Sequence, residues 1–262
     1  MSVMIKCVPI AFYLPGDVPI YLFSLLMGLA AMIGLVGVAW KAPNGEAHRY
    51  VDAGLWSLVG ALFGGRAGFV VINWEYFSAH LWESWQVYLG GFSWAGALGG
   101  GLVALGLTAW LSKAALGELA LGMLPLLASL SIGSWLSCWL TGCAYGPPAG
   151  SWWGIPSRDE WGEVALRLPV QLIGALLTLS LFWLLDWGRG FFKSPGQAFS
   201  AALLGFSVIM LATSLIRADV LPEWLGMRVD IWAASAFTLF GGVCLLVSYF
   251  KEMGREQERT SE

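Results

Sequence analysis

The sequence predicts an all-α, polytopic membrane protein with seven transmembrane helices. Of its 262 residues, 58% are hydrophobic and only 12% are charged, whereas a soluble domain of this length needs far more charge on its surface. A run of about 20 apolar residues crosses the ~30 Å hydrocarbon core of a bilayer. Seven runs are long enough: residues 18–40, 51–74, 92–111, 119–140, 169–187, 197–216 and 229–250. We expect one membrane domain, residues 1–250, followed by a polar tail at 251–262.

The ends and glycines of these runs support that assignment. The first run is too long for a signal peptide and ends in Trp40-Lys41 without a small-residue cleavage site, so we expect it to remain as a helix. Glycines spaced four apart let transmembrane helices approach closely. Three such pairs predict close helix contacts: Gly60 with Gly64, Gly96 with Gly100, and Gly142 with Gly146.

The basic residues that flank the predicted helices indicate the orientation of the chain. With seven spans the two termini lie on opposite sides, and the side richer in Lys and Arg is cytoplasmic. We therefore expect the N-terminus and the segments 73–91 and 142–168 outside, and the tail in the cytoplasm of a bacterial inner membrane. The richer side holds Lys41, Arg49, Lys113, Arg189, Lys193, Lys251, Arg255 and Arg259; the other holds Lys6, Arg158, Arg167, Arg217 and Arg228.

The segment 73–91 has no Lys or Arg but carries Trp74, Trp82, Trp85 and Tyr88. Aromatic residues of this kind gather at the membrane–water interface, so we expect an outer interfacial segment. The net charge of −3 is too small to indicate a nucleic-acid partner.

The four cysteines do not predict a disulfide framework. Cys7 and Cys244 lie at opposite ends of the chain. Cys138 and Cys143 are five apart and lie on different helix faces unless the helix stops between them, as Gly142 allows. We expect small packed hydrophobic side chains rather than a metal site or a nucleophile, because no histidines accompany the pair and apolar burial silences a thiol.

Arg66 lies well inside the second apolar run. A guanidinium at the centre of a bilayer costs at least ~2.5–3.5 kcal/mol on insertion scales, so it needs a partner. One alternative is structural, with helix-end carbonyls or a neighbouring carboxylate as acceptors. The other is functional, with a lipid phosphate as the ligand.

Three segments carry a resemblance. Residues 64–69 read Gly-Gly-Arg-Ala-Gly-Phe, residues 90–97 read Gly-Gly-Phe-Ser-Trp-Ala-Gly-Ala, and residues 135–146 read Trp-Leu-Ser-Cys-Trp-Leu-Thr-Gly-Cys-Ala-Tyr-Gly. In this order they resemble the prolipoprotein diacylglyceryl transferase family. Its second helix has Gly-x-Arg-x-Gly-Tyr, its third begins Gly-Gly-Met-Ser-Phe-His-Gly-Gly, and its fourth ends Arg-x-Gly-Asn-Phe-x-Asn-Gly-Glu-x-Tyr-Gly. Weaker similarity lies at Pro15, at Tyr21 and at residues 167–172.

The resemblance implies a seven-helix inner-membrane enzyme that moves a diacylglyceryl group from phosphatidylglycerol to a precursor's cysteine thiol. Most polar groups that the family uses are replaced. Its third-helix histidine is Ala95, and Met210 and Ser214 stand where its sixth helix has an arginine and a glutamate. In the signature, the arginine is Trp135, the asparagines are Cys138 and Thr141, and the glutamate is Cys143.

The residues that remain suggest binding more than catalysis. The resemblance implies lipid-phosphate ligands at Arg66, Tyr21, Tyr145 and Gln171. It implies a pocket lined by Trp94, Ala95, Trp135, Cys138, Gly142, Cys143, Met210 and Ser214. We expect a bound phospholipid, phosphatidylglycerol in particular, and no metal or other cofactor.

Two functions stay open. The first is a catalytically degenerate family member that acts as a lipid-binding, structural subunit of a larger membrane complex. The alternative is an active transferase that uses the loop acids Asp159, Glu160 and Glu163 in place of the lost residues, although an exposed acidic cluster is usually just solvated.

Overall fold

The computed structural model describes the whole chain except residues 1–9, 15–17, 88–89, 151 and 262. Within these residues, seven helices are long and apolar enough to cross a membrane. They are α1 (Leu22–Lys41), α2 (Ala47–Ile72), α4 (Trp94–Leu111), α6 (Leu124–Thr141), α7 (Val170–Trp187), α8 (Pro195–Ile216) and α9 (Val229–Ser261). The prediction of seven transmembrane helices is confirmed.

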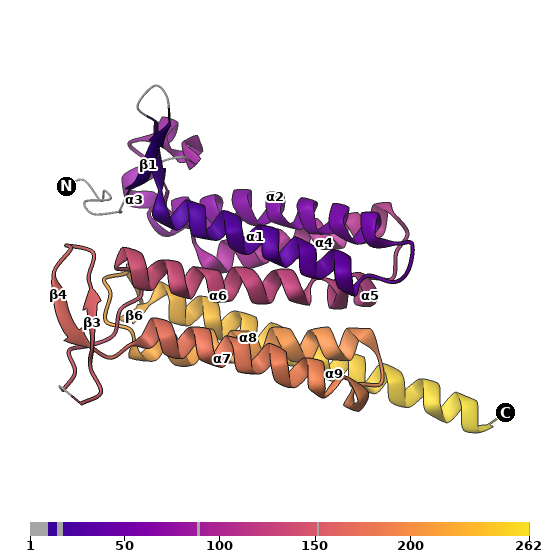
Figure 1. Cartoon of the computed structure of the whole chain (residues 1–262). Helices are drawn as coiled ribbons and strands as arrows, with labels where there is room; N and C mark the ends of the chain where they lie inside the picture. The colour runs from indigo at the N-terminus through magenta and orange to yellow at the C-terminus, as the bar shows by residue number, and fades with distance from the viewer. Residues whose placement is uncertain (1–9, 15–17, 88–89, 151, 262) are drawn as a thin grey trace.

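Short elements connect the long helices. The helical ones are α3 (Trp74–Phe77), η1 (Leu81–Trp85), α5 (Leu116–Gly122) and η3 (Arg189–Phe191). Three antiparallel two-stranded hairpins pair β1 (Ile10–Leu14) with β2 (Val18–Tyr21), β3 (Ile155–Arg158) with β4 (Val164–Arg167), and β5 (Glu223–Trp224) with β6 (Met227–Arg228). The three hairpins lie at one end of the bundle, which we call the hairpin end, and α5 and the C-terminus lie at the other, the tail end (Figure 1).

The helix boundaries differ from the predicted ones for local reasons. The fourth predicted run is two helices, because α5 ends at Gly122 and α6 restarts with Pro125 in its first turn. The first run loses Val18–Tyr21 to a strand. The tail from residue 251 is a continuation of α9 up to Ser261.

Glycines bring α2 and α4 into direct backbone contact. A Cβ built on Gly64 would lie 2.4 Å from the carbonyl oxygen of Gly96, and one on Gly60 would lie 2.4 Å from that of Gly100. Two of the three predicted glycine pairs therefore mark a close helix contact. The third prediction is wrong, because Gly142 and Gly146 lie beyond the end of α6, in a loop.

The buried core has two parts. Towards the tail end, α1, α2, α4, α5 and α6 bury a cluster that includes Val38, Ala53, Leu119 and Leu126. Towards the hairpin end, α6, α7, α8 and α9 bury a second cluster of Trp135, Ala144, Ala175, Phe206, Met210 and Ala234. This second cluster includes Trp135 and Met210, two of the residues that the sequence singles out as a site.

Candidate functional site

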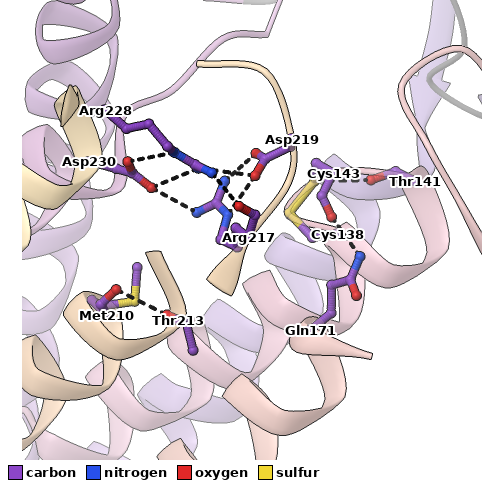
Figure 2. Close-up of polar contacts among 10 residues, drawn as sticks. All are labelled: Cys138, Thr141, Cys143, Gln171, Met210, Thr213, Arg217, Asp219, Arg228 and Asp230. Atoms are coloured by element: carbon purple, nitrogen blue, oxygen red, sulfur yellow. Dashed lines mark hydrogen bonds and ion pairs between the residues drawn. A yellow bond between two sulfur atoms is a disulfide. The ribbon is translucent and has the colours of Figure 1, made fainter. Parts of the chain in front are cut away.

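The end of α6 is a tight turn closed by a disulfide. Gly142 caps the helix with a φ of 82°, and the N–H groups of Gly142 and Cys143 both donate to the carbonyl of Cys138, at 2.9 and 3.0 Å. The turn brings the Cα atoms of Cys138 and Cys143 to 4.5 Å, and the two residues form a disulfide (Figure 2). The expectation of unpaired cysteines at this turn is wrong, because α6 stops at Thr141 and the chain turns back. Cys7 lies outside the described residues, and Cys244 is free in α9.

Three neighbouring elements hold this turn. From the first turn of α7, the fully buried Gln171 donates through Nε2 to the carbonyl of Cys143 at 2.9 Å. The N–H of Ala218, just after α8, donates to the carbonyl of Tyr145 at 2.9 Å. A Cβ on Gly142 would lie 2.5 Å from a backbone oxygen of the β3–β4 hairpin. The structure therefore brings five predicted site residues together: Cys138, Gly142, Cys143, Tyr145 and Gln171.

The acids of the β3–β4 hairpin are not simply solvated. Asp159 is 5% exposed; its carboxylate accepts from Arg167 at 2.9 Å and from the backbone N–H groups of Trp161 and Glu163. The interpretation of a solvated acidic cluster is thus wrong for Asp159, while Glu163 is exposed. No sequence signal marks this burial, because it depends on the hairpin folding back onto α6.

Tyr145 connects the disulfide turn to the hairpin. Its ring lies 4.5 Å from the guanidinium of Arg167, in a cation–π contact. The carboxylate oxygens of Glu160 are shielded from solvent. Burial, followed by the nearby Glu160 carboxylate, raises the pKa of Tyr145 above its ordinary value. The hydroxyl therefore stays protonated and can only donate or accept a hydrogen bond at neutral pH.

Two arginines and two aspartates form a buried network beside this turn (Figure 2). Arg217 pairs with Asp219 and Asp230, and Arg228 pairs with the same two carboxylates, at 3.1 Å each. Arg228 also donates to the carbonyl of Arg217 at 2.7 Å. The two positive and two negative charges cancel. The ion pairs connect the end of α8 to the start of α9. Sequence reasoning missed it; the available signal is Arg-x-Asp, which occurs at 217–219 and again at 228–230.

Arg66 is 5% exposed and finds its acceptors on the protein backbone. Its Nε donates to the carbonyl of Ser84 at 3.0 Å, Nη1 to those of Gly90 and Gly91, and Nη2 to that of Glu83. The guanidinium also lies 5.3 Å from the ring centre of Phe77. Backbone carbonyls are the acceptors expected if the role of Arg66 is structural. The role of Arg66 as a lipid-phosphate ligand stays a prediction, and its hydrogen bonds to backbone carbonyls do not support it.

The other proposed phosphate ligands lie elsewhere. Tyr21 ends β2, where it pairs with Ile10 in the β1–β2 hairpin. The acceptors of Arg66 belong to the interfacial segment 73–91, in which Trp74, Trp82 and Trp85 are exposed and Tyr88 lies outside the described residues. Gln171 and Tyr145 contact instead the loop after α6 and the elements around it. Arg66 and the pair of Gln171 and Tyr145 therefore bind two separate sets of partners.

Four of the eight predicted pocket-lining residues belong to one packed apolar cluster or pack against it. Trp135 is 4% and Met210 6% exposed, and Cys138 and Trp94 pack against the same cluster. Trp94 meets Phe206 edge-on, with ring centres 6.3 Å apart. Ser214 is 1% exposed, and its hydroxyl has no hydrogen-bond partner among the described residues. Ala95, in the first turn of α4, is half-buried. The hollows near Trp110 and near His48 lie at the tail end, away from these residues.

The comparisons with known proteins agree with this arrangement of helices. The family model for prolipoprotein diacylglyceryl transferase matches residues 9–247. Three relatives are each called phosphatidylglycerol–prolipoprotein diacylglyceryl transferase. That of Streptomyces griseus is 25% identical over 92% of this chain and 77% of its own length. That of Thermosynechococcus vestitus is 27% identical over 82% of this chain and 80% of its own length. That of Finegoldia magna is 24% identical over 95% of this chain and 99% of its own length. A match that covers nearly the whole chain, on seven helices in the expected order, shows that this chain belongs to the prolipoprotein diacylglyceryl transferase family.

Proposed function

We propose that this chain is a phospholipid-binding member of the family that does not transfer diacylglyceryl groups, and that it serves as a structural subunit of a larger membrane complex. The observation that carries the proposal is the packing of Trp135. Its indole stands at the place of the signature arginine and lies directly against Gly174 of α7, where a Cβ would come within 2.5 Å of the ring. An aromatic ring packed in this way leaves no room at this position for the headgroup of a lipid substrate.

The charges at the hairpin end support the same proposal. Departure of a glycerol phosphate leaves an anion that requires cationic or hydrogen-bond donors aimed at it. Arg217 and Arg228 are neutralised by aspartates, Arg167 by Asp159, and the Arg66 donors point to backbone carbonyls. Each of these cations would have to give up a protein partner before it could bind a phosphate.

The exposed aromatic residues support the proposed contact with phospholipid. Exposed tryptophans lie at both ends of the bundle. Trp82 and Trp85 in η1, Trp152 before β3 and Trp224 in β5 belong to the hairpin end, and Trp40, Trp110 and Trp187 lie in the last turns of α1, α4 and α7, towards the tail end. Indoles at two levels of a helical bundle fit the two interfaces of a bilayer. We propose phosphatidylglycerol as one of the bound lipids, since the named relatives use it.

The test is an assay for transfer. Purified full-length protein is placed in vesicles that contain phosphatidylglycerol, together with a peptide that carries a lipobox cysteine; the Streptomyces griseus relative serves as the positive control. We expect lipidated peptide at the background level and no rescue of a cell that lacks its transferase. Robust transfer by this chain would overturn the proposal.

The subunit role has a separate test. Affinity purification from native membranes in mild detergent should recover this chain with stoichiometric membrane-protein partners. Recovery of the chain alone, with native lipid retained, would contradict the subunit role and leave only lipid binding.

One observation favours a second candidate, the active transferase. The Glu160 carboxylate is shielded from solvent beside Tyr145, an environment that suits a general base better than an exposed acid does. If the assay gives product, Glu160→Gln should abolish it while the exposed Glu163→Gln should not. Equal effects of the two changes would exclude Glu160 as the base.

A further inference from the structure

The Cys138–Cys143 disulfide does little to cross-link the fold. It joins residues only five apart, and a disulfide that closes a short loop removes less chain entropy than one that closes a long loop. The same two residues are already joined through the backbone, because the Cys143 N–H donates to the Cys138 carbonyl. A role in cross-linking distant parts of the chain therefore does not explain the disulfide.

The two sulfur atoms differ in their surroundings. Cys138 lies in the last turn of α6, where the negative end of the helix dipole disfavours a thiolate. In the oxidised pair the Thr141 hydroxyl donates to the carbonyl of Ser137 at 2.8 Å. It also lies 3.6 Å from Cys143 Sγ (Figure 2), so rotation of its O–H bond can turn the proton towards a thiolate on Cys143. When the bond breaks, the electron pair is therefore better placed on Cys143 than on Cys138. Both cysteines are only half-buried; Cys138 lies in the last turn of α6, and Cys143 lies just beyond its end.

The backbone around Cys143 is held independently of the disulfide. Gln171 binds the carbonyl of Cys143, and Ala218 binds that of Tyr145. Between them Ala144 is buried with a φ of 54°, a left-handed conformation that a non-glycine residue keeps only where its surroundings impose it. With these anchors in place, Cys143 stays opposite Cys138 after reduction, so the bond can form again by the reverse exchange, in which the disulfide of two incoming thiols is the oxidant.

We propose that Cys138 and Cys143 form a thiol–disulfide exchange site for thiols presented at the hairpin end. The thiolate of an incoming molecule bonds to Cys138 Sγ, the Cys138–Cys143 bond breaks, and Cys143 Sγ leaves as a thiolate, which takes up the proton that the incoming thiol has lost. A second incoming thiol attacks the sulfur of the first. The products are the disulfide of the incoming thiols and the reduced cysteine pair, so two thiols are oxidised for each chain. This site does not depend on whether the chain transfers lipid.

The experiment uses the full chain in lipid nanodiscs, with Cys7→Ala and Cys244→Ala so that only this pair can react. Oxidised protein is mixed with glutathione in one arm and with a short cysteine-containing peptide in the other. The reaction is quenched with acid, free thiols are alkylated, and the adducts are located by mass spectrometry. We expect the mixed disulfide on Cys138 and the alkyl group on Cys143. Reaction in both arms identifies thiols of polypeptides as substrates, and reaction with glutathione alone restricts the site to small thiols.

A pair of variants tests the assignment of the leaving sulfur. Thr141→Val removes the hydroxyl beside Cys143 and should slow exchange about tenfold. Thr108→Val is the matched control, because the Thr108 hydroxyl donates to the carbonyl of Ala104 in α4 at 2.8 Å, as the Thr141 hydroxyl does to that of Ser137. This variant should leave the rate unchanged. Equal rates for the two variants, or an adduct on Cys143, would overturn the assigned direction of attack. A disulfide that reacts in neither arm until the protein is unfolded, as judged by tryptophan fluorescence, would overturn the proposal itself.

Discussion

The indole of Trp135 rests on Gly174, with α6 and α7 so close that a Cβ at Gly174 would lie 2.5 Å from the ring. Gly174→Ala should therefore overpack the contact and destabilise the protein by ~1–3 kcal/mol. The matched control is Gly28→Ala in α1, where a Cβ would meet nothing within 4 Å. Thermal unfolding in detergent is the measurement. Equal melting temperatures for the two variants would show that the indole moves away without cost.

Arg66 should be needed to hold the interfacial segment. Arg66→Met leaves several backbone carbonyls without their donor, at ~1–3 kcal/mol for each that stays buried. We expect faster proteolysis within residues 81–87. Arg49→Met serves as the control, because Arg49 pairs with Glu46 at the surface, where an ion pair contributes little. If added phosphatidylglycerol protected the wild-type segment but not that of Arg66→Met, a phosphate role would gain support.

The network between α8 and α9 should be sensitive to the loss of any one charge. Asp230 is 7% exposed and pairs with both Arg217 and Arg228, and removal of one partner from a buried pair costs ~3–5 kcal/mol. Asp230→Asn should therefore lower the melting temperature strongly. Glu252→Gln, which breaks the pair with the exposed Arg255, should have almost no effect. A mild effect of Asp230→Asn would mean that water enters the network.

Tyr145 should make the stability of the fold depend on alkaline pH. Burial and Glu160 raise its pKa above the ordinary 10.0. The contribution of Tyr145 to the free energy of unfolding is therefore fully present below pH 10. Above that pH the unfolded chain loses the proton first, so stability falls as the pH rises towards the folded-state pKa. Tyr145→Phe should remove this dependence. The tyrosinate absorbance of Tyr145 is the difference between the ultraviolet titrations of the wild type and of Tyr145→Phe. This difference should appear only above the ordinary pKa range of tyrosine. A difference that appears near pH 10 would contradict the burial.

The orientation predicted from the basic residues can be tested with one added cysteine. In a background of Cys7→Ala and Cys244→Ala, Ser261→Cys should not react with a membrane-impermeant maleimide in intact cells, because the tail is expected in the cytoplasm. After lysis it should react. Labelling in intact cells would reverse the orientation and would place the Cys138–Cys143 disulfide on the reducing side of the membrane, where disulfides are rare.

The sequence predicts the membrane part of this fold well, because hydropathy over about 20 residues is a strong and local signal. The glycine spacing also predicts close helix contacts at Gly60 and Gly64, but only the structure shows that α4 is the partner of α2. The three hairpins are harder to predict, because each is short and is stabilised by what it packs against. The β3–β4 hairpin, for example, rests on Gly142 and on the pair of Asp159 with Arg167.

The sequence predicts the location of the candidate site but not its bonds. The signature segment indicates the right turn. The disulfide, however, depends on where α6 stops, and Gly142, as the C-cap, ends the helix at Thr141. The acceptors of Arg66 lie 17 to 25 residues further along the chain, at a distance where no spacing rule operates. Long-range pairing of this kind becomes visible only when the chain is folded.

The length of the last helix has a consequence for the space beyond the membrane. α9 runs unbroken for 33 residues, which at 1.5 Å per residue is ~50 Å, well beyond the ~30 Å of hydrocarbon. The extra turns carry Lys251, Glu252 and Arg255 and continue the helix as a rigid extension instead of a flexible linker. A protein that bound its tip would be held at a fixed height above the bilayer, and rotation of α9 about its axis would turn that protein with it.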